Sequence, residues 1–438
     1  MNIGLLGCGV VGGGILDFCA GREDLTVTKV LVRRPRPDLG ALAVTDIADI
    51  VSDAGIGIVA EVMGGLHPAY EYICAALKAG KHVVTANKAV ISAYYPELTG
   101  LARECGVSLR CTAAVGGGIP WLTNLERCKR LDSICREQGL TAVLAVGGGS
   151  TIDCAKMVAA GARYAGDAWE LVLDRSRITA ALPVAAVLTN AATGSEMDGF
   201  AVISDMSKHE KWGTGNDHTK PVFSILDPTY SMSLPAYQTA SGASDIMSHT
   251  FENYFNRTKG AYLQSRLAEG VLKTCIHYAP IALRKPDDYE ARANLMWASS
   301  LAINGLLDCG ESTSWSVHAM EHELSAFYDI THGAGLALLT PYWMEYVLRE
   351  ETVWKFVEYG TNVWGIDRSG APMEIARAAI GKTREFFTAI GMPTHLRELN
   401  IDDTHFDVMA EKAANGGLAN GFVPLDKDDV LKIFRMAL

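Results

Sequence analysis

The sequence predicts an α/β N-terminal region with parallel, doubly wound (Rossmann-like) sheets, followed by an all-α helical domain that binds a metal. Short β-rich runs alternate with helical patterns through the first half of the chain, which is typical of βαβ units. Two glycine-rich turns each lie between such a run and a helical pattern. Beyond residue 233 apolar residues recur at helical spacing. We therefore expect three domains, at 1–125, 126–232 and 233–438.

Composition excludes several classes of protein. The chain has 438 residues, of which 49% are hydrophobic, and this length is enough for two or three domains. A net charge of -11 without a basic stripe argues against a nucleic-acid surface. The first residues lack a signal peptide, and no apolar run reaches the roughly 18 residues of a membrane span. The ten cysteines form no CxxC pair, so we expect reduced thiols in a cytoplasmic protein without a membrane partner.

The first predicted unit is a nucleotide-binding sheet. The expected strands are 2–6, 27–32, 56–62, 82–86 and 107–111, and the expected helices include 68–79 and 95–104. A GxGxxG turn with Gly7, Gly9 and Gly12 follows the first strand, where glycines let the backbone approach a pyrophosphate. After the second strand the usual acidic ribose ligand is replaced by an arginine-rich run, 33–36. These arginines either pair with the 2′-phosphate of NADP(H) or solvate a loop.

A second glycine turn opens the middle region. A helix at 126–138 and a strand at 141–146 precede the turn 147–150, which leads into a helix; the later expected strands are 184–188, 200–204 and 221–226. Backbone amides at such a helix start bind phosphate oxygens, and Ser150 adds a hydroxyl donor. A polar turn, 189–196, follows the strand 184–188, and its hydroxyls are placed to reach a ribose or a nicotinamide amide. A plain strand-to-helix connection is the alternative for either turn.

The helical region contains a cluster of metal-binding residue types. The expected helices include 241–255, 263–278, 289–304 and 373–390. Asp245 and His249 are four residues apart and share a helix face, as do His318 and His322, and His332 follows in a loop-like segment. A carboxylate with several imidazoles suits Fe(II) or Zn(II) and leaves room for a substrate oxygen. Single buried histidines are usually core residues, but this grouping favours a metal site.

The first 120 residues resemble homoserine dehydrogenase. The resemblance rests on the segments 4–12, 61–65, 80–88 and 116–120. In that family the lysine at the position of Lys88 lies at the active site beside the nicotinamide. The family's Gly-Tyr-Thr-Glu-Pro-Asp-Pro type substrate motif has no counterpart downstream. Homoserine dehydrogenase activity is therefore a disfavoured alternative.

From about residue 126 onward the chain resembles the iron-containing alcohol dehydrogenases. The motifs are 147–156, 192–196, 244–249 and 318–326, and the nearest branch is the NADPH-linked butanol dehydrogenases and aldehyde reductases. The resemblance implies a homodimer or higher homo-oligomer that converts short-chain alcohols and aldehydes with NADP(H) or NAD(H) and Fe(II) or Zn(II). It implies these metal ligands: Asp245, His249, His318 and His332. His322 becomes a candidate catalytic proton relay, and the implied cofactor contacts are Gly148, Gly149, Ser150, Asp153, Thr189 and Thr193.

One departure from this family leaves the cofactor site open. Members begin with an N-terminal segment of their own that helps to bind the cofactor, and the homoserine dehydrogenase-like unit occupies its place here. Gly7, Gly9 and Gly12 therefore stay candidate cofactor contacts as well. An impaired fusion that only binds nucleotide or metal is an alternative. Another is a zinc peptidase, because residues 318–322 fit the HxxEH pattern with Glu321 as general base.

Overall fold

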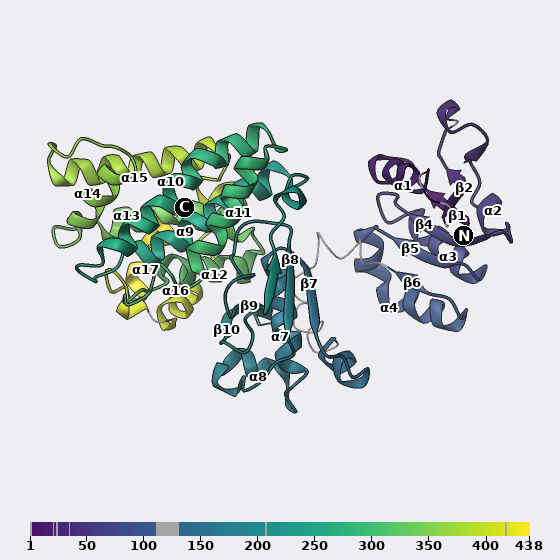
Figure 1. The fold of residues 1–438 in the computed structure, drawn as a ribbon, viewed down its shortest axis with the longest axis horizontal. Coiled ribbons are helices and arrows are strands. Elements are labelled where there is room, and N and C mark those ends of the chain that lie inside the picture. The colour runs from purple at the N-terminus through teal and green to yellow at the C-terminus, as the bar shows by residue number, and fades with distance from the viewer. Residues whose placement is uncertain are drawn as a thin grey trace. The chain divides into compact units, whose positions relative to one another are not determined.

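The computed structural model describes residues 2–20, 22, 25–34, 36–110, 131–205, 208–416 and 418–438. The chain divides into two compact units, Met1–Pro120 and Trp121–Leu438 (Figure 1). The expected boundary between residues 125 and 126 lies outside the described residues. Of the expected helix 126–138, the described part is helical over 131–137.

The first unit is a doubly wound parallel sheet. Its six strands are β1 (Asn2–Leu6), β2 (Thr26–Leu31), β3 (Ala43–Val44), β4 (Ile56–Glu61), β5 (His82–Thr85) and β6 (Leu109–Arg110), and all pairs are parallel. The strand order is β3-β2-β1-β4-β5-β6, so the chain winds outward in both directions from β1 and β4. The helices are α1 (Val10–Ala20), α2 (Ala48–Val51), α3 (Ala69–Lys78) and α4 (Lys88–Glu104). All five expected strands are present, and the short β3 was not expected.

The second unit begins with a smaller parallel sheet. Its order is β11-β8-β7, with β7 at Val143–Gly147, β8 at Val184–Leu188 and β11 at Phe223–Ile225. Helix α7 (Gly149–Gly161) follows β7 directly, and α8 is at Ala168–Leu173. The expected strand at 200–204 is present as β9 (Phe200–Asp205), but it forms an antiparallel pair with β10 (Glu210–Gly215) outside this sheet. Strand β10 was not expected from the sequence.

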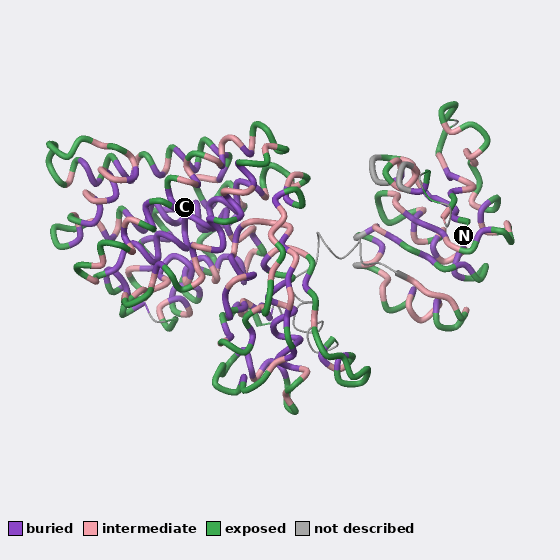
Figure 2. Tube along the Cα trace, viewed as in Figure 1, coloured by how far each residue is buried: buried purple, intermediate pink, exposed green. Residues whose placement is uncertain are grey.

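Burial alternates from residue to residue along β7 and β8, so the two faces of the β11-β8-β7 sheet differ in burial; Figure 2 colours the chain by burial. Ala145 on β7 and Ala186 on β8 are almost fully buried in the core that contains α7. On the alternate positions Leu144 is 61% exposed, Val146 58% and Phe223 on β11 56%. Among the described residues of the second unit, these apolar side chains on one face are exposed, and no strand pairs with the outer edge of β7.

The remainder of the second unit is helical and has one large hydrophobic core. The helices are α9 (Ala236–Tyr254), α10 (Tyr262–Arg284), α11 (Tyr289–Ile303), α12 (Ser316–Tyr328), α13 (His332–Val347), α14 (Val353–Asn362), α15 (Pro372–Ala389), α16 (Phe406–Asn415) and α17 (Lys427–Ala437). Helix α9 is buried continuously from Thr239 to Tyr254, since α10, α11 and α13 pack around it. No helix in the described ranges is long and apolar enough to cross a membrane.

Two glycines allow α9 to contact its neighbours closely. A Cβ on Gly333, at the start of α13, would lie 2.0 Å from the backbone oxygen of Ser241 on α9. A Cβ on Gly242 would lie 2.3 Å from the backbone oxygen of Ala191, in the turn after β8. Both distances are shorter than any side chain tolerates, so only glycine permits these contacts. They bring the first turn of α13 and the polar turn 189–196 against the same stretch of α9.

Candidate metal centre and cofactor turns

Four side chains from three helices meet around one carboxylate oxygen. Asp245 and His249 lie one turn apart on α9, His318 lies on α12, and His332 is the first residue of α13. The Oδ1 atom of Asp245 is 3.5 Å from His249 Nε2, 3.9 Å from His318 Nε2 and 3.8 Å from His332 Nε2. The ligand atoms of Asp245, His318 and His332 lie within 4.8 Å of one another, whereas His249 lies close to Asp245 but is not part of that group.

The donor atoms of this cluster fit a divalent cation. Asp245 Oδ1 and His318 Nε2 are buried and have no hydrogen-bond partner in the protein. Leaving such atoms unpaired is costly, and buried polar atoms nearly always have a partner. Ligands on a tetrahedral metal with bonds of about 2.1 Å lie roughly 3.4 Å apart, and the three Nε2 atoms lie 3.5–3.9 Å from Asp245 Oδ1. The cluster therefore has the spacing and chemistry of a metal centre.

Burial sets the protonation of the cluster. Burial raises the pKa of Asp245 to about 7. This effect exceeds the electrostatic interaction with His318, which lowers the same pKa. Burial is also the main cause that lowers the pKa values of His249 and His332 well below the usual 6.5. Both imidazoles are therefore neutral near neutral pH and keep a lone pair for a metal.

Two of the histidines have a carboxylate at their other ring nitrogen. His318 Nδ1 lies 3.2 Å from Oε1 of Glu252, which also accepts backbone N–H groups of residues 316–318 at the start of α12. His332 Nδ1 contacts Glu321 Oε2. A carboxylate at Nδ1 favours the tautomer whose Nε2 lone pair is free for a metal. Both rings are thus oriented toward Asp245.

The structure places His322 beside the cluster. Its ring centroid is 6.2 Å from that of His318 and 5.4 Å from that of His332. One of its ring nitrogens lies within 4.8 Å of ligand atoms of His332 and Glu321. His322 does not belong to the group of ligand atoms that Asp245 forms with His318 and His332. Burial and the nearby Lys211 lower the pKa of His322 well below its usual value. A neutral imidazole next to the candidate ligands suits proton transfer, and this catalytic role stays a prediction.

Lys211 is a site residue that the sequence analysis missed. It lies on β10, and its Nζ is 3.2 Å from His332 Nδ1 and 3.4 Å from Glu321 Oε2. The side chain is only 4% exposed, and Glu321 is fully buried. No motif marks this lysine, because β10 pairs with β9 and only the tertiary fold brings its strand to α12 and α13.

The two predicted cofactor turns lie next to each other. They follow β7 and β8, which are parallel neighbours, and the N–H of Thr189 donates to the carbonyl of Gly147 at 3.0 Å. A Cβ on Gly149 would lie 2.2 Å from Oγ1 of Thr193. Gly148 is the N-cap of α7 without a side-chain cap, so the first N–H groups of this helix are available to an anion. Ligands of α/β sheets bind at such carboxyl ends of strands.

Asp153 has a different environment from the one that the sequence analysis expected. Its carboxylate accepts hydrogen bonds from Ser195 Oγ at 2.5 Å and from the backbone N–H of Val202 at 2.9 Å. Lys156 donates to the same Ser195 at 2.8 Å and pairs with Asp198 at 2.8 Å. Burial raises the pKa of Asp153 to about 6. This network connects α7 to the second turn and to β9, and a direct contact of Asp153 with a cofactor stays a prediction.

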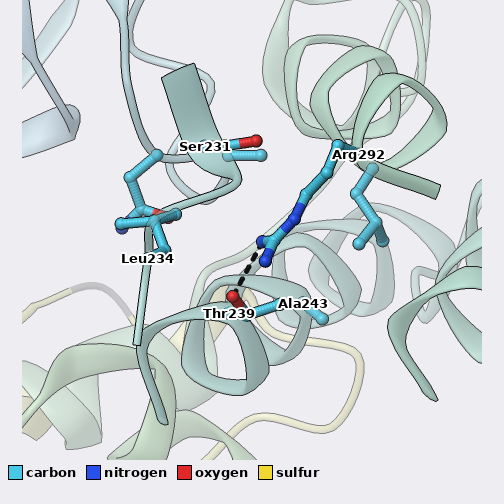
Figure 3. Close-up of a pocket in the computed structure, with 8 residues that line it drawn as sticks. Ser231, Leu234, Thr239, Ala243 and Arg292 are labelled. Atoms are coloured by element: carbon cyan, nitrogen blue, oxygen red, sulfur yellow. Dashed lines mark hydrogen bonds between the residues drawn. The ribbon is translucent and has the colours of Figure 1, made fainter. Parts of the chain in front are cut away.

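A cavity adjoins the second turn (Figure 3). Its lining residues are Asn190, Ala191, Ser231, Leu234, Thr239, Ala243, Arg292 and Leu295. The buried guanidinium of Arg292 donates to Thr239 Oγ1 at 2.8 Å and to the carbonyl of Pro286 at 2.9 Å. The candidate metal ligands do not line this cavity. Residues of the turn 189–196, of α9 and of α11 thus line the same cavity.

The glycine turn of the first unit has its own arginine neighbour. Gly7 adopts a φ of 96°, and the carbonyl of Cys8 accepts a hydrogen bond from Arg36 Nη1 at 3.3 Å. The same guanidinium pairs with Asp38 at 2.6 Å. Arg36 thus lies at the turn with an acidic partner. The side chain of Lys88 lies outside the described residues, and the cofactor contacts of Gly7, Gly9 and Gly12 stay predictions.

Three protein-family models match parts of the chain. The model of the Fe-containing alcohol dehydrogenase family, C-terminal, matches residues 239–438, and that of iron-containing alcohol dehydrogenase matches residues 67–228. The chain belongs to the iron-containing alcohol dehydrogenase family. The NAD binding domain of homoserine dehydrogenase matches residues 7–112, so both resemblances are confirmed. The alcohol dehydrogenase match begins well before residue 126, where the resemblance was expected to start.

Individual relatives agree with the family. The chain is 57% identical over 304 residues to "NADH-dependent butanol dehydrogenase A" of Clostridium acetobutylicum, covering 69% of this chain and 78% of that protein. It is 38% identical to "NADPH-dependent aldehyde reductase YqhD" of Escherichia coli, covering 69% and 78%. The solved structure of a Thermotoga maritima NADH-dependent butanol dehydrogenase A matches with a TM-score of 0.70 at 32% identity, over 89% of this chain and 94% of that one. This family member is therefore an NAD(P)-linked, metal-dependent oxidoreductase of CH–OH groups.

Membership of this family removes the peptidase alternative, and the surroundings of Glu321 agree. A peptidase general base must reach a water molecule on the metal. Glu321 is fully buried, and its two oxygens contact Ser325 and His332. It has no free oxygen for that task.

Proposed function

We propose that the protein reduces short-chain aldehydes to alcohols, and catalyses the reverse oxidation, with NADH as the preferred hydride donor. The observation that carries this proposal is the convergence of three Nε2 atoms on the unpaired Oδ1 of Asp245. The identity of 57% and 56% to two proteins named NADH-dependent butanol dehydrogenases supports the substrate class and the cofactor.

The proposed metal ligands are Asp245, His249, His318 and His332. When bound there, Fe(II) supplies a Lewis acid for the substrate oxygen, and a nicotinamide supplies the hydride. One carboxylate with three imidazoles is a ligand set that suits Fe(II) and also accepts Zn(II). Of the four side chains, that of His332 is the most exposed, at 22%, so substrate approaches from its side.

The remaining residues bind the cofactor and move the proton. The turns 147–150 and 189–196 present backbone N–H groups and hydroxyls at the carboxyl ends of two parallel strands, where they hold the pyrophosphate and ribose. His322 is neutral and lies on the His332 side of the cluster. It transfers the proton between the substrate oxygen and solvent.

The proposed reaction has a direct assay. Mixing Fe(II)-loaded protein, NADH and butanal is expected to consume NADH at a rate proportional to protein concentration, and NADPH is expected to give slower turnover. Homoserine with NAD or NADP is expected to give none, because only the nucleotide-binding part of that family is matched. Stoichiometric metal binding without turnover of any short aldehyde would instead favour the impaired fusion.

Metal affinity is expected to fall below neutral pH. The carboxyl group of Asp245 has a pKa of about 7 in the metal-free protein, so it must lose a proton to bind a metal. Protons therefore compete with the metal below this pKa, and the affinity drops up to about tenfold per pH unit there, while it levels off above it. His249 and His332 are already neutral near pH 7, so their protonation contributes little to the pH dependence of metal affinity between about pH 6 and pH 8. Chelator competition at about pH 6 and pH 8 measures the difference, and equal affinities would contradict this assignment of Asp245.

A further inference from the structure

Glu321 is a buried carboxylate that the proposed reaction does not use directly. It lies on α12 with 0% exposure. Ser325 Oγ donates to its Oε1, while its Oε2 contacts His332 Nδ1 and lies 3.4 Å from Lys211 Nζ. Helix α13 packs directly on it, since a Cβ on Gly335 would lie 2.8 Å from Glu321 Cγ. A buried charge is costly unless it is paired, so this arrangement requires an explanation.

A second cation site is the first explanation to consider. Glu321, His322 and His332 each offer an atom within 4.8 Å of the others. The ammonium group of Lys211, however, already lies 3.2 Å from His332 Nδ1 and 3.4 Å from Glu321 Oε2. A second metal ion there would be repelled by this positive charge. The ammonium group of Lys211 therefore takes the place that a second metal ion would occupy beside Glu321.

We propose that Glu321 is a positioning residue that prepares His332 to bind the metal. Its Oε2 accepts a hydrogen bond from the Nδ1–H group of His332, and this fixes the ring in the tautomer whose Nε2 lone pair faces Asp245. Ser325 holds the other carboxylate oxygen, and Lys211 balances the charge. The inference rests on the proposed metal site.

His332 needs this support more than the other candidate ligands do. It stands at the first position of α13, and its side chain is 22% exposed, compared with 5% for His249 and 7% for His318. His318 is held within α12 and by Glu252, a carboxylate that also caps the helix. For His332, Glu321 is the carboxylate at Nδ1 in the described structure. Loss of its charge should affect metal binding more than folding.

The test compares metal binding by full-length variants. Glu321→Gln keeps the shape of the side chain, and the double variant Glu321→Gln with Lys211→Met removes both buried charges. Affinity is measured by chelator competition with Zn(II), and ligand geometry by the visible absorption of Co(II)-loaded protein. Both variants are expected to bind Zn(II) about 10- to 100-fold more weakly and to show a changed Co(II) spectrum. Glu323→Gln, on the same helix, is the matched control and is expected to bind as the unaltered protein does.

The outcomes separate this inference from the proposed function. Unchanged affinity and an unchanged Co(II) spectrum in the double variant would overturn the positioning role of Glu321. The double variant decides the question if the single one fails to fold, because it removes the buried charge of Lys211 together with that of Glu321. If the unaltered protein fails to bind one equivalent of metal, the proposed function fails as well. Weaker binding in both Glu321 variants with normal binding by Glu323→Gln would support the role.

Discussion

Replacing His249 by alanine is expected to abolish stoichiometric metal binding and to lower turnover of butanal by more than about 100-fold. His249 Nε2 lies 3.5 Å from Asp245 Oδ1, and its side chain is 5% exposed. Loss of a residue that merely orients a ligand costs 10–100-fold in affinity or activity, so loss of a ligand should cost more. Metal content after dialysis and kcat with NADH measure the two effects.

The matched control is His277→Ala. His277 is an exposed histidine on α10 whose ring contacts Tyr278 at 4.6 Å between centroids. The control is expected to keep one equivalent of metal and normal turnover. If the His249 variant retained both the metal and the activity, His249 would not be a ligand.

Gly149→Ala is expected to lower kcat/KM for NADH by about 100-fold, since small displacements of binding groups have effects of that size. The added Cβ would lie 2.2 Å from Thr193 Oγ1 and 2.4 Å from Thr193 Cγ2. The two cofactor turns must therefore separate, and the N-terminus of α7 shifts with them. Overpacking of this kind also lowers the free energy of unfolding by about 1–3 kcal/mol. Initial rates at varied NADH and urea unfolding measure the two effects.

Two further variants make this result specific. Gly270→Ala on α10 introduces a Cβ with no atom within 4 Å, so we expect unchanged kinetics and a gain of about 0.5–1 kcal/mol in unfolding free energy. Adding Thr193→Gly to Gly149→Ala removes the atoms that clash. It should restore most of the stability, while NADH affinity stays reduced because the proposed hydroxyl contact is lost. An unchanged KM for NADH in Gly149→Ala alone would contradict the assignment of this turn.

The spacing of apolar residues along the chain predicted most of the strands and helices that the structure contains. The alternation of β-rich runs and helical patterns correctly located the strands around β1, β4, β7 and β8, because parallel strands in such sheets are short apolar runs. Strand β10 was not expected because its sequence, residues 210–215, contains two glycines and begins with two charged residues, which are not typical of a strand. It pairs antiparallel with β9, from which only residues 206–209 separate it, and this pairing lies outside the parallel sheet that the alternating pattern predicts. Lys211 was missed with it.

Spacing predicted a cluster of metal-binding residue types, and the division into candidate ligands and a candidate proton relay came from the family resemblance. Residues four apart on a helix share a face, so His318 and His322 were expected together, and their ring centroids are 6.2 Å apart. Only His318 reaches Asp245, because the approach of α9 and α13 selects one of the two rings. The carboxylates behind the ligands, Glu252 and Glu321, depend on the same tertiary packing. A single sequence contains no signal for them beyond their residue type.

Titration of metal-free protein with Fe(II), with turnover of NADH and butanal followed at each addition, tests the central claim most directly. The proposed site predicts no turnover without metal, followed by a linear rise that ends at one equivalent of Fe(II) per chain. Turnover by fully metal-free protein would contradict the account, and so would one equivalent of bound metal without any turnover.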